Sequence, residues 1–231
     1  MVGGSNPSGQ AIIIYYMFTI YNLFYTPVIK VKVNPTSFDK KTILNTVIKN
    51  YRKQPFRNKH DTQSKLHHYY NDWDNEKFDK VDLSSLVNVY DEIFKNLVSN
   101  IPNKAPISYQ FEIENITVMK NKSNDFKKHN HLNGNIYFAC VHYISVGKNS
   151  APLRLHNPLP LYDYLPKELN TLRDSKFDIK NPFHSLVCSH YDIIVEEDDM
   201  IIIPSFLLHS VSQEENDTKH RVAIATNLSL M

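Results

Sequence analysis

Three histidines in the sequence stand where their side chains could share one metal ion. His129 and His131 are two residues apart in the segment KKHNHLNGN, and His209 lies in the later apolar segment PSFLLHSV. In an extended segment, residues i and i+2 project to the same side, so the first two imidazoles can reach one ion. A buried histidine needs a polar partner, which makes His209 a candidate for the third ligand. The spacing therefore predicts a metal held by His129, His131 and His209.

Arg221 adds a second chemical feature, because it stands at the start of the last alternating strand of the chain. An arginine that enters a barrel interior is costly unless it meets an anion, and a planar guanidinium suits a carboxylate. Three imidazoles, or two and a carboxylate, on one face of an octahedral metal leave positions for an oxidant and a chelating cosubstrate. Taken singly, these residues have plainer explanations: a solvated histidine pair, a hydrogen-bonded core histidine and a surface arginine. The order H-x-H, H, R favours the joint site.

The elements that must position these residues are two helices followed by many strands. Residues 37–53 and 86–101 carry apolar side chains at helical spacing, and Pro102 ends the second stretch. Between them, residues 52–80 are mostly polar and predict a loop. This order predicts a mainly β fold of the α+β kind, in which the helices back a sheet or barrel.

The strands are predicted from alternation and from their content of β-branched and aromatic residues. Residues 109–118 alternate, with a one-residue shift after Ile113 that indicates a β-bulge. Residues 136–146 form a continuous apolar run, which predicts a central strand. The other predicted strands are 153–155, 191–195, 200–204 and 221–230.

The uncharged segment 11–29 is about as long as a membrane span requires. It contains Asn22, Pro27 and several tyrosines, and no basic region precedes it as a signal peptide would need. A pair of β-strands broken near Asn22 is therefore predicted in place of a membrane segment. Residues 1–10 are predicted to form a flexible tail, and residues 11–231 a single domain.

Composition limits the classes of function. A net charge of +2 with dispersed lysines and arginines gives no strong nucleic-acid signal, and the sequence has no glycine-rich phosphate loop. Cys140 and Cys188 lack the spacing of a zinc knuckle or a disulfide framework, which favours free thiols in a reducing compartment such as the cytoplasm. The abundance of asparagine and lysine is compatible with an AT-rich viral genome, and hence with the host cytoplasm.

Several segments together resemble the 2-oxoglutarate- and iron(II)-dependent oxygenase superfamily, especially a phage and bacterial branch of it. The matching segments are LFYTPV (23–28), HNHLN (129–133), the apolar strand with Tyr143, PSFLLHSV (204–211) and RVAIATN (221–227). The resemblance implies a double-stranded β-helix, which is a cupin-like jelly roll. It also implies iron(II) on His129, His131 and His209, with Arg221 on the distal carboxylate of 2-oxoglutarate.

The chemistry of this family splits O2 while 2-oxoglutarate loses CO2 to give succinate, and a C–H bond of a further substrate is hydroxylated. The resemblance implies 2-oxoglutarate, O2 and an unidentified substrate as partners, with no catalytic residue beyond the ligands of metal and cosubstrate. Three positions depart from the family pattern. His131 occupies the position of the usual Asp or Glu, and Ala223 occupies that of a serine that helps to bind the cosubstrate. Residues 197–199 replace a glycine turn. The first departure implies an all-imidazole triad or a shifted ligand set.

Two other functions fit the same residues. The spacing P-x-x-x-x-H of residues 204–209 also suits a cupin-like metal-binding protein that does not use 2-oxoglutarate. The glutamate that cupins carry a few residues after H-x-H is missing here. The third interpretation is a non-catalytic β-barrel, such as a structural or binding component of a virion.

Overall fold

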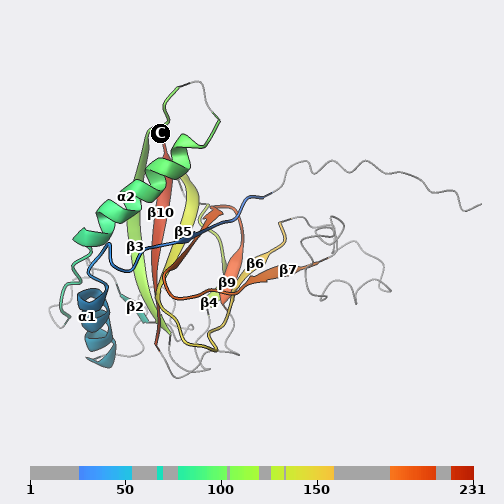
Figure 1. Ribbon diagram of the computed structural model, residues 1–231. Coiled ribbons are helices and arrows are strands. Elements are labelled where there is room, and N and C mark those ends of the chain that lie inside the picture. The colour runs from blue at the N-terminus through green and yellow to red at the C-terminus, as the bar shows by residue number, and fades with distance from the viewer. Residues whose placement is uncertain are drawn as a thin grey trace, which may run out of the picture.

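The computed structural model describes residues 26–53, 67–69, 78–102, 105–119, 126–132, 134–158, 188–211 and 220–231, which form two antiparallel sheets and two helices (Figure 1). The strand order of the larger sheet is β1 (Ile29–Lys32), β8 (Asp199–Pro204), β5 (Ile136–Ser145), β10 (Arg221–Leu230), β3 (Tyr109–Met119) and β2 (His67–Tyr69). The order of the smaller sheet is β4 (Phe126–His129), β9 (His209–Val211), β6 (Leu153–His156) and β7 (His190–Ile193).

From β3 onward the chain passes back and forth between the two sheets. Strands β3, β5, β8 and β10 lie in the larger sheet, and β4, β6, β7 and β9 lie in the smaller one. Side chains from both sheets pack into one apolar cluster, so the two sheets face each other. Eight antiparallel strands wound in this way form a double-stranded β-helix. The fold class predicted from the sequence is therefore confirmed.

Strand β10 shows why the larger sheet has two different faces. Its side chains alternate, and Val222, Ile224 and Leu228 pack in the apolar core under the helices. Arg221 and Ala223 point the other way, into the space between the sheets. The neighbouring strand β5 was predicted as a central strand, and it lies between β8 and β10 as expected.

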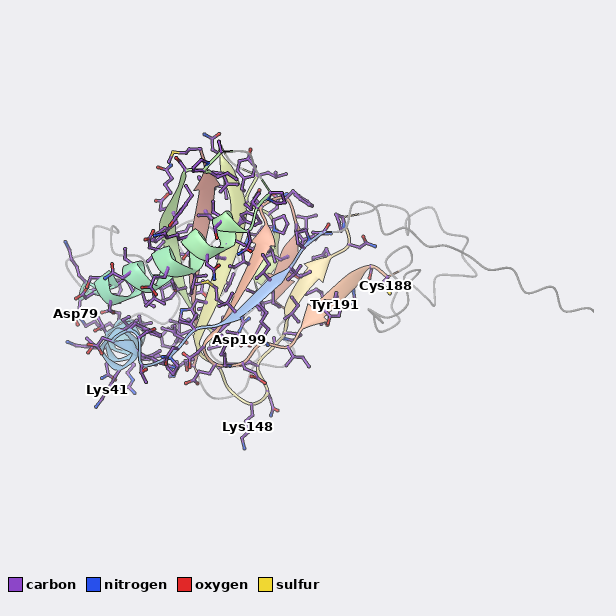
Figure 2. All side chains as sticks on the ribbon, turned by 45° about the horizontal axis from the view of Figure 1, so that its top comes forward. Lys41, Asp79, Lys148, Cys188, Tyr191 and Asp199 are labelled. Atoms are coloured by element: carbon purple, nitrogen blue, oxygen red, sulfur yellow. The ribbon has the colours of Figure 1, made fainter. Side chains whose placement is uncertain are left out.

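Helices α1 (Lys40–Lys53) and α2 (Ser84–Ser99) cover the outer face of the larger sheet (Figure 1). Both were predicted, although α1 begins after residue 37 because residues 35–39 form turns. Figure 2 shows Lys41 on the side of α1 that points away from the sheets. The buried apolar residues of the two helices belong to the predicted apolar stripes: Ile43, Val47, Tyr51, Leu86, Tyr90, Phe94 and Val98. The polar residue Asn50 of α1 is also buried, and it exchanges hydrogen bonds with the backbone of Asp79.

The predicted bulge in β3 is confirmed at Glu114. Ala225 of β10 lies opposite Asn115, whereas the next residue of β10 lies opposite Ile113. Glu114 is therefore the extra residue. A bulge re-aims the side chains around it. Glu114 and Asn115 both line the space between the sheets, whereas Ile113 packs under the helices.

Residues 196–199 (EEDD), which we call the acidic turn, lie where the family pattern has a glycine turn. Asp198 has a φ of 67°, a left-handed conformation that glycine adopts freely and aspartate tolerates better than most residues. Its carboxylate accepts from Lys40 Nζ at 2.6 Å, which ties α1 to the turn. Asp199, labelled in Figure 2, accepts from Lys30 Nζ at 2.7 Å, which ties β1 to β8.

Strands β1, β2, β4 and β9 were not predicted. The predicted loop 52–80 is wrong at residues 67–69, which pair with β3, and at its first two residues, which are helical. Such short strands are stabilised by their partners rather than by a pattern of their own. Residues 78–80 of that loop have no helix or strand, as predicted, and its residues 54–66 and 70–77 lie outside the described residues. Residues 1–10 and most of the predicted strand pair in residues 11–29 also lie outside them. Among the residues that the structure describes, no helix combines the length and apolar character needed to cross a membrane.

Candidate metal and carboxylate site

Strand pairing brings His129 and His209 together. His129 is the last residue of β4 and His209 the first of β9, and they lie opposite each other in the antiparallel ladder. His131 follows just beyond β4, where its backbone N–H donates to the carbonyl oxygen of Ser205 at 2.8 Å. One ring nitrogen from each histidine lies within 4.8 Å of the other two. The structure therefore gathers the three predicted histidines into one group, which we call the histidine triad.

Backbone carbonyl groups fix two of the three imidazoles. The distance from His129 Nδ1 to the carbonyl oxygen of Lys127 is 2.8 Å, and that from His209 Nδ1 to the carbonyl oxygen of Leu207 is 3.0 Å. A carbonyl oxygen only accepts, so Nδ1 carries the proton in both rings and Nε2 keeps its lone pair. In histidines that bind metals, the ring nitrogen that does not coordinate the metal typically donates to such an acceptor.

Burial keeps these imidazoles neutral. It lowers the pKa of His129 to about 4 and the pKa of His209 to about 3, and the neighbouring imidazoles of the triad act in the same direction. A metal binds the neutral form of histidine, because the coordinating nitrogen must be free of its proton. His129 and His209 are therefore in the coordinating form at neutral pH.

A cavity of about 280 Å³ lies between the two sheets, and the histidine triad forms part of its wall. The larger sheet contributes Tyr143 and Arg221, and apolar surface comes from Met119 and Leu153. A cavity with apolar walls and a few convergent polar groups is the usual form of a site for a small molecule. Its size suits a metal ion together with a small organic acid.

Arg221 lies in this cavity with 3% of its surface exposed. Its guanidinium carbon is 4.8 Å from the centre of the Tyr143 ring, and Nη1 donates to Sδ of Met119 at 3.0 Å. Nε and Nη2 of Arg221 and the hydroxyl of Tyr143 are buried without a hydrogen-bond partner among the described residues. Burial lowers the pKa of Arg221 and raises the pKa of Tyr143. An arginine keeps its charge in a protein even so, and both side chains remain donors.

These unpaired donors determine what the cavity can bind. A buried donor without an acceptor costs stability, because it has lost its hydrogen bonds to water. A carboxylate in the cavity would accept from the guanidinium of Arg221 and the hydroxyl of Tyr143 at once. The cavity thus combines a group suited to a metal with a pair of side chains suited to an anion.

All four residues singled out in the sequence line the same cavity, and their roles as ligands remain predictions. The sequence did not reveal Glu114, whose Oε2 is 3.5 Å from Nδ1 of His131. Its only signal is the break in alternation that marks the bulge. That break does not show which side chain lies across the cavity.

No known family profile and no curated protein matches this chain. Solved structures do match it. A prolyl hydroxylase from Trichoplax adhaerens, in complex with a hypoxia inducible factor peptide, has a TM-score of 0.53 and 11% identity, covering 88% of this chain and 83% of its own. A prolyl-4-hydroxylase from Pseudomonas putida has a TM-score of 0.51 and 7% identity, and the match covers 87% of this chain and 92% of the hydroxylase. The non-heme alpha-ketoglutarate-dependent carbocyclase SnoK of nogalamycin biosynthesis has a TM-score of 0.53 and 12% identity, and the match covers 88% of this chain and 79% of SnoK.

These matches identify the fold. The chain has the double-stranded β-helix fold of these hydroxylases and of the carbocyclase over most of its length. At such low identity the likeness concerns the fold, and the activity has to be argued from the side chains of the cavity.

Proposed function

We propose that the protein is an iron(II)- and 2-oxoglutarate-dependent oxygenase that hydroxylates a C–H bond of a further substrate. The observation that carries this proposal is the cavity shared by the histidine triad and Arg221. One part of its wall offers three imidazoles, and another offers unpaired buried donors. This combination suits a cosubstrate that chelates a metal at one end and presents a carboxylate at the other, as 2-oxoglutarate does.

The histidine triad fits iron(II). His129, His131 and His209 would hold the ion and leave coordination positions for the cosubstrate and oxygen. The rings of His129 and His209 are already held in the required tautomer by their backbone contacts. When bound, iron(II) supplies the activation of O2, in which 2-oxoglutarate yields succinate and CO2 and one oxygen atom enters the substrate.

Arg221 and Tyr143 fit the distal carboxylate of 2-oxoglutarate. The family pattern has a serine two residues after the arginine, where this chain has Ala223. Tyr143 on β5 lies directly opposite Ala223 in the ladder, and its buried hydroxyl has no partner among the described residues. We propose that Tyr143 supplies, from the neighbouring strand, the hydroxyl that alanine lacks.

The apolar part of the cavity wall orients the polar groups and excludes water. Met119 accepts from Nη1 of Arg221, which leaves the other guanidinium nitrogens for the carboxylate. Leu153 and Val211 add apolar surface from the smaller sheet. Hydrogen bonds between charged groups are stronger in such a dry site than in water. In this scheme no side chain has to take or give a proton.

The location follows from the cysteines. Cys140 and Cys188 are buried, and they form no disulfide bond in the part of the chain that the structure describes. Free thiols are typical of reducing compartments. We therefore propose the cytoplasm, or the host cytoplasm if the gene belongs to the phage branch that the motifs resemble.

Anaerobic titration with iron(II) and 2-oxoglutarate tests the proposed function. A weak visible charge-transfer band is expected when both are bound, because 2-oxoglutarate would then chelate the iron. The band should vanish in Arg221→Ala, while iron binding itself persists. Metal binding without the band would indicate a cupin-like metal protein, and no metal binding would indicate a non-catalytic β-barrel.

A further inference from the structure

We infer that Glu114 supplies the carboxylate that the metal centre lacks at position 131. Glu114 acts as a positioning residue, because it holds the His131 ring at Nδ1, the nitrogen that faces away from the metal position. The inference rests on the metal site proposed above and adds a residue to it. The family pattern places Asp or Glu at position 131, whereas this chain has an imidazole there. A carboxylate does lie beside the triad, and it comes from a different strand.

Glu114 reaches His131 from the bulge in β3. At this bulge, Glu114 and Asn115 both lie on the cavity side of the strand. Oε2 of Glu114 is 3.5 Å from Nδ1 of His131, whose side chain is 11% exposed. Glu114 does not belong to the group of ligand atoms that lie within 4.8 Å of one another. Its carboxylate therefore lies beside the His131 ring rather than at the metal position.

The contact completes a pattern that the three imidazoles share. Nδ1 of His129 and Nδ1 of His209 each face a backbone carbonyl, and Nδ1 of His131 faces a carboxylate. In each ring Nε2 is then the nitrogen available to the metal. The first two contacts use the backbone, which a substitution of a side chain leaves in place. The third contact uses the side chain of Glu114, which can be replaced.

Asn227 holds Glu114 in turn. Nδ2 of Asn227 donates to Oε2 of Glu114 at 3.3 Å. This contact sets the orientation of the amide, because a flipped amide would place its oxygen against the carboxylate. One oxygen of Glu114 thus lies near two nitrogen atoms that can donate to it. Glu112 shares the strand and the charge of Glu114, and both side chains are exposed, that of Glu114 to 44%, but only Glu114 lines the cavity.

A carboxylate behind a coordinating imidazole affects the metal through the ring. It fixes the tautomer and the orientation of the imidazole and makes Nε2 more basic. It also places a negative charge near a site whose three ligands are neutral. A coordinated aspartate at position 131 would supply that charge directly. Loss of the Glu114 carboxylate should therefore weaken metal binding without removing a ligand.

Titration of Glu114→Gln with cobalt(II) tests the inference, because cobalt(II) probes the site without oxygen chemistry. Glutamine keeps the shape of the side chain and removes its charge. The dissociation constant for cobalt(II) is expected to rise about 10- to 100-fold, and the visible spectrum of the bound cobalt should change. Thermal unfolding of the metal-free protein should stay as in the wild type. Glu112→Gln removes the same charge from an exposed position on the same strand, and it should bind cobalt like the wild type.

Equal cobalt affinity in Glu114→Gln and the wild type would overturn the inference. So would undiminished cobalt binding in His131→Ala, because Glu114 would then not act through that ring. If cobalt binding depends on Glu114 but iron(II) and 2-oxoglutarate give no charge-transfer band, the inference stands and the proposed oxygenase function fails. A wild-type protein that binds no cobalt would overturn both.

Discussion

The cavity between the sheets and the acidic turn before β8 both bury charged side chains, but the charges of the turn are paired and that of Arg221 in the cavity is not paired among the described residues. In the acidic turn, the side chains of Asp198 and Lys40 are 10% and 16% exposed and lie 2.6 Å apart. Asp199, also buried, is paired with Lys30. In the cavity, Arg221 is 3% exposed, and no carboxylate of the described residues forms an ion pair with it.

The difference separates charges that serve the fold from a charge that serves a ligand. A buried ion that lacks a partner opposes folding, and an ion pair relieves much of that penalty. The acidic turn has its partners within the chain, so its charges hold α1 and β1 against β8. In the cavity, two guanidinium nitrogens of Arg221 and the hydroxyl of Tyr143 have no hydrogen-bond acceptor among the described residues, so an anion from outside would complete the site. Substitutions in the turn should therefore reduce stability, and substitutions in the cavity should reduce function.

The largest effect is expected for His209→Ala, which removes one imidazole of the triad. Succinate formation from 2-oxoglutarate should be abolished, because the metal would lose a ligand. The free energy of unfolding of the metal-free protein should change by no more than about 1 kcal/mol, because the ring borders a cavity. Mass spectrometry of succinate and urea unfolding would measure the two quantities. Unchanged turnover would refute the assignment of His209 as a ligand.

Acid should destabilise the cavity before it affects the acidic turn. The lowered pKa values of His129 and His209, about 4 and about 3, lie below the ordinary value of 6.5. The unfolded chain therefore takes up protons first, and stability is lost as the pH falls from 6.5 towards 4. The two histidines together should remove about 2–4 kcal/mol between pH 7 and pH 5.

The acidic turn loses its contribution to stability at lower pH than the cavity histidines do. Burial alone would raise the pKa of Asp199, but the hydrogen bonds from Lys30 and from the backbone N–H of Glu196 outweigh it, and the pKa is lowered. Its contribution is present above the ordinary value of 3.8 and is lost only below it. Urea unfolding at pH 7, 5 and 3 measures both effects. His209→Gln should have a shallower dependence between pH 7 and 5, and an unchanged slope would contradict this account.

Two substitutions of opposite expected sign compare the regions directly. Asp198→Asn keeps a residue that tolerates positive φ and removes the ion pair with Lys40, so it should lower the free energy of unfolding by about 1–3 kcal/mol. Arg221→Met replaces an unpaired buried charge by an apolar side chain, so it should leave stability unchanged or raise it by about 1–2 kcal/mol. Urea unfolding of the metal-free proteins would show both changes. A loss of stability in Arg221→Met would mean that Arg221 serves the fold.

The smallest effect is expected for Lys49→Ala, which breaks an exposed ion pair. Lys49 Nζ is 2.8 Å from Asp79, which Figure 2 labels beside α1, and the two side chains are 65% and 43% exposed. Water screens such a pair, so the midpoint of urea unfolding should not move measurably. A shift as large as that of Asp198→Asn would show that burial is not what distinguishes the acidic turn.

Periodic patterns predicted the long elements well. The predicted helix 86–101 corresponds to α2 at Ser84–Ser99, and the predicted strand 221–230 has the bounds of β10. These patterns depend on neighbours in the sequence, so they are visible without the structure. The short strands β4 and β9 gave no such signal, although they hold His129 and His209. Three or four residues have little preference of their own, and their strand form comes from pairing with each other.

The sequence by itself determined which side chains could do chemistry: two histidines on one side of an extended segment, a third in an apolar segment, and an arginine at the entrance of a buried strand. The tertiary structure decided which of them meet, because β4 and β9 pair across the smaller sheet. It also decided that Glu114 lies beside His131. That contact joins the bulge of β3 to the segment that follows β4. No local pattern encodes a distance between side chains on opposite walls of a cavity.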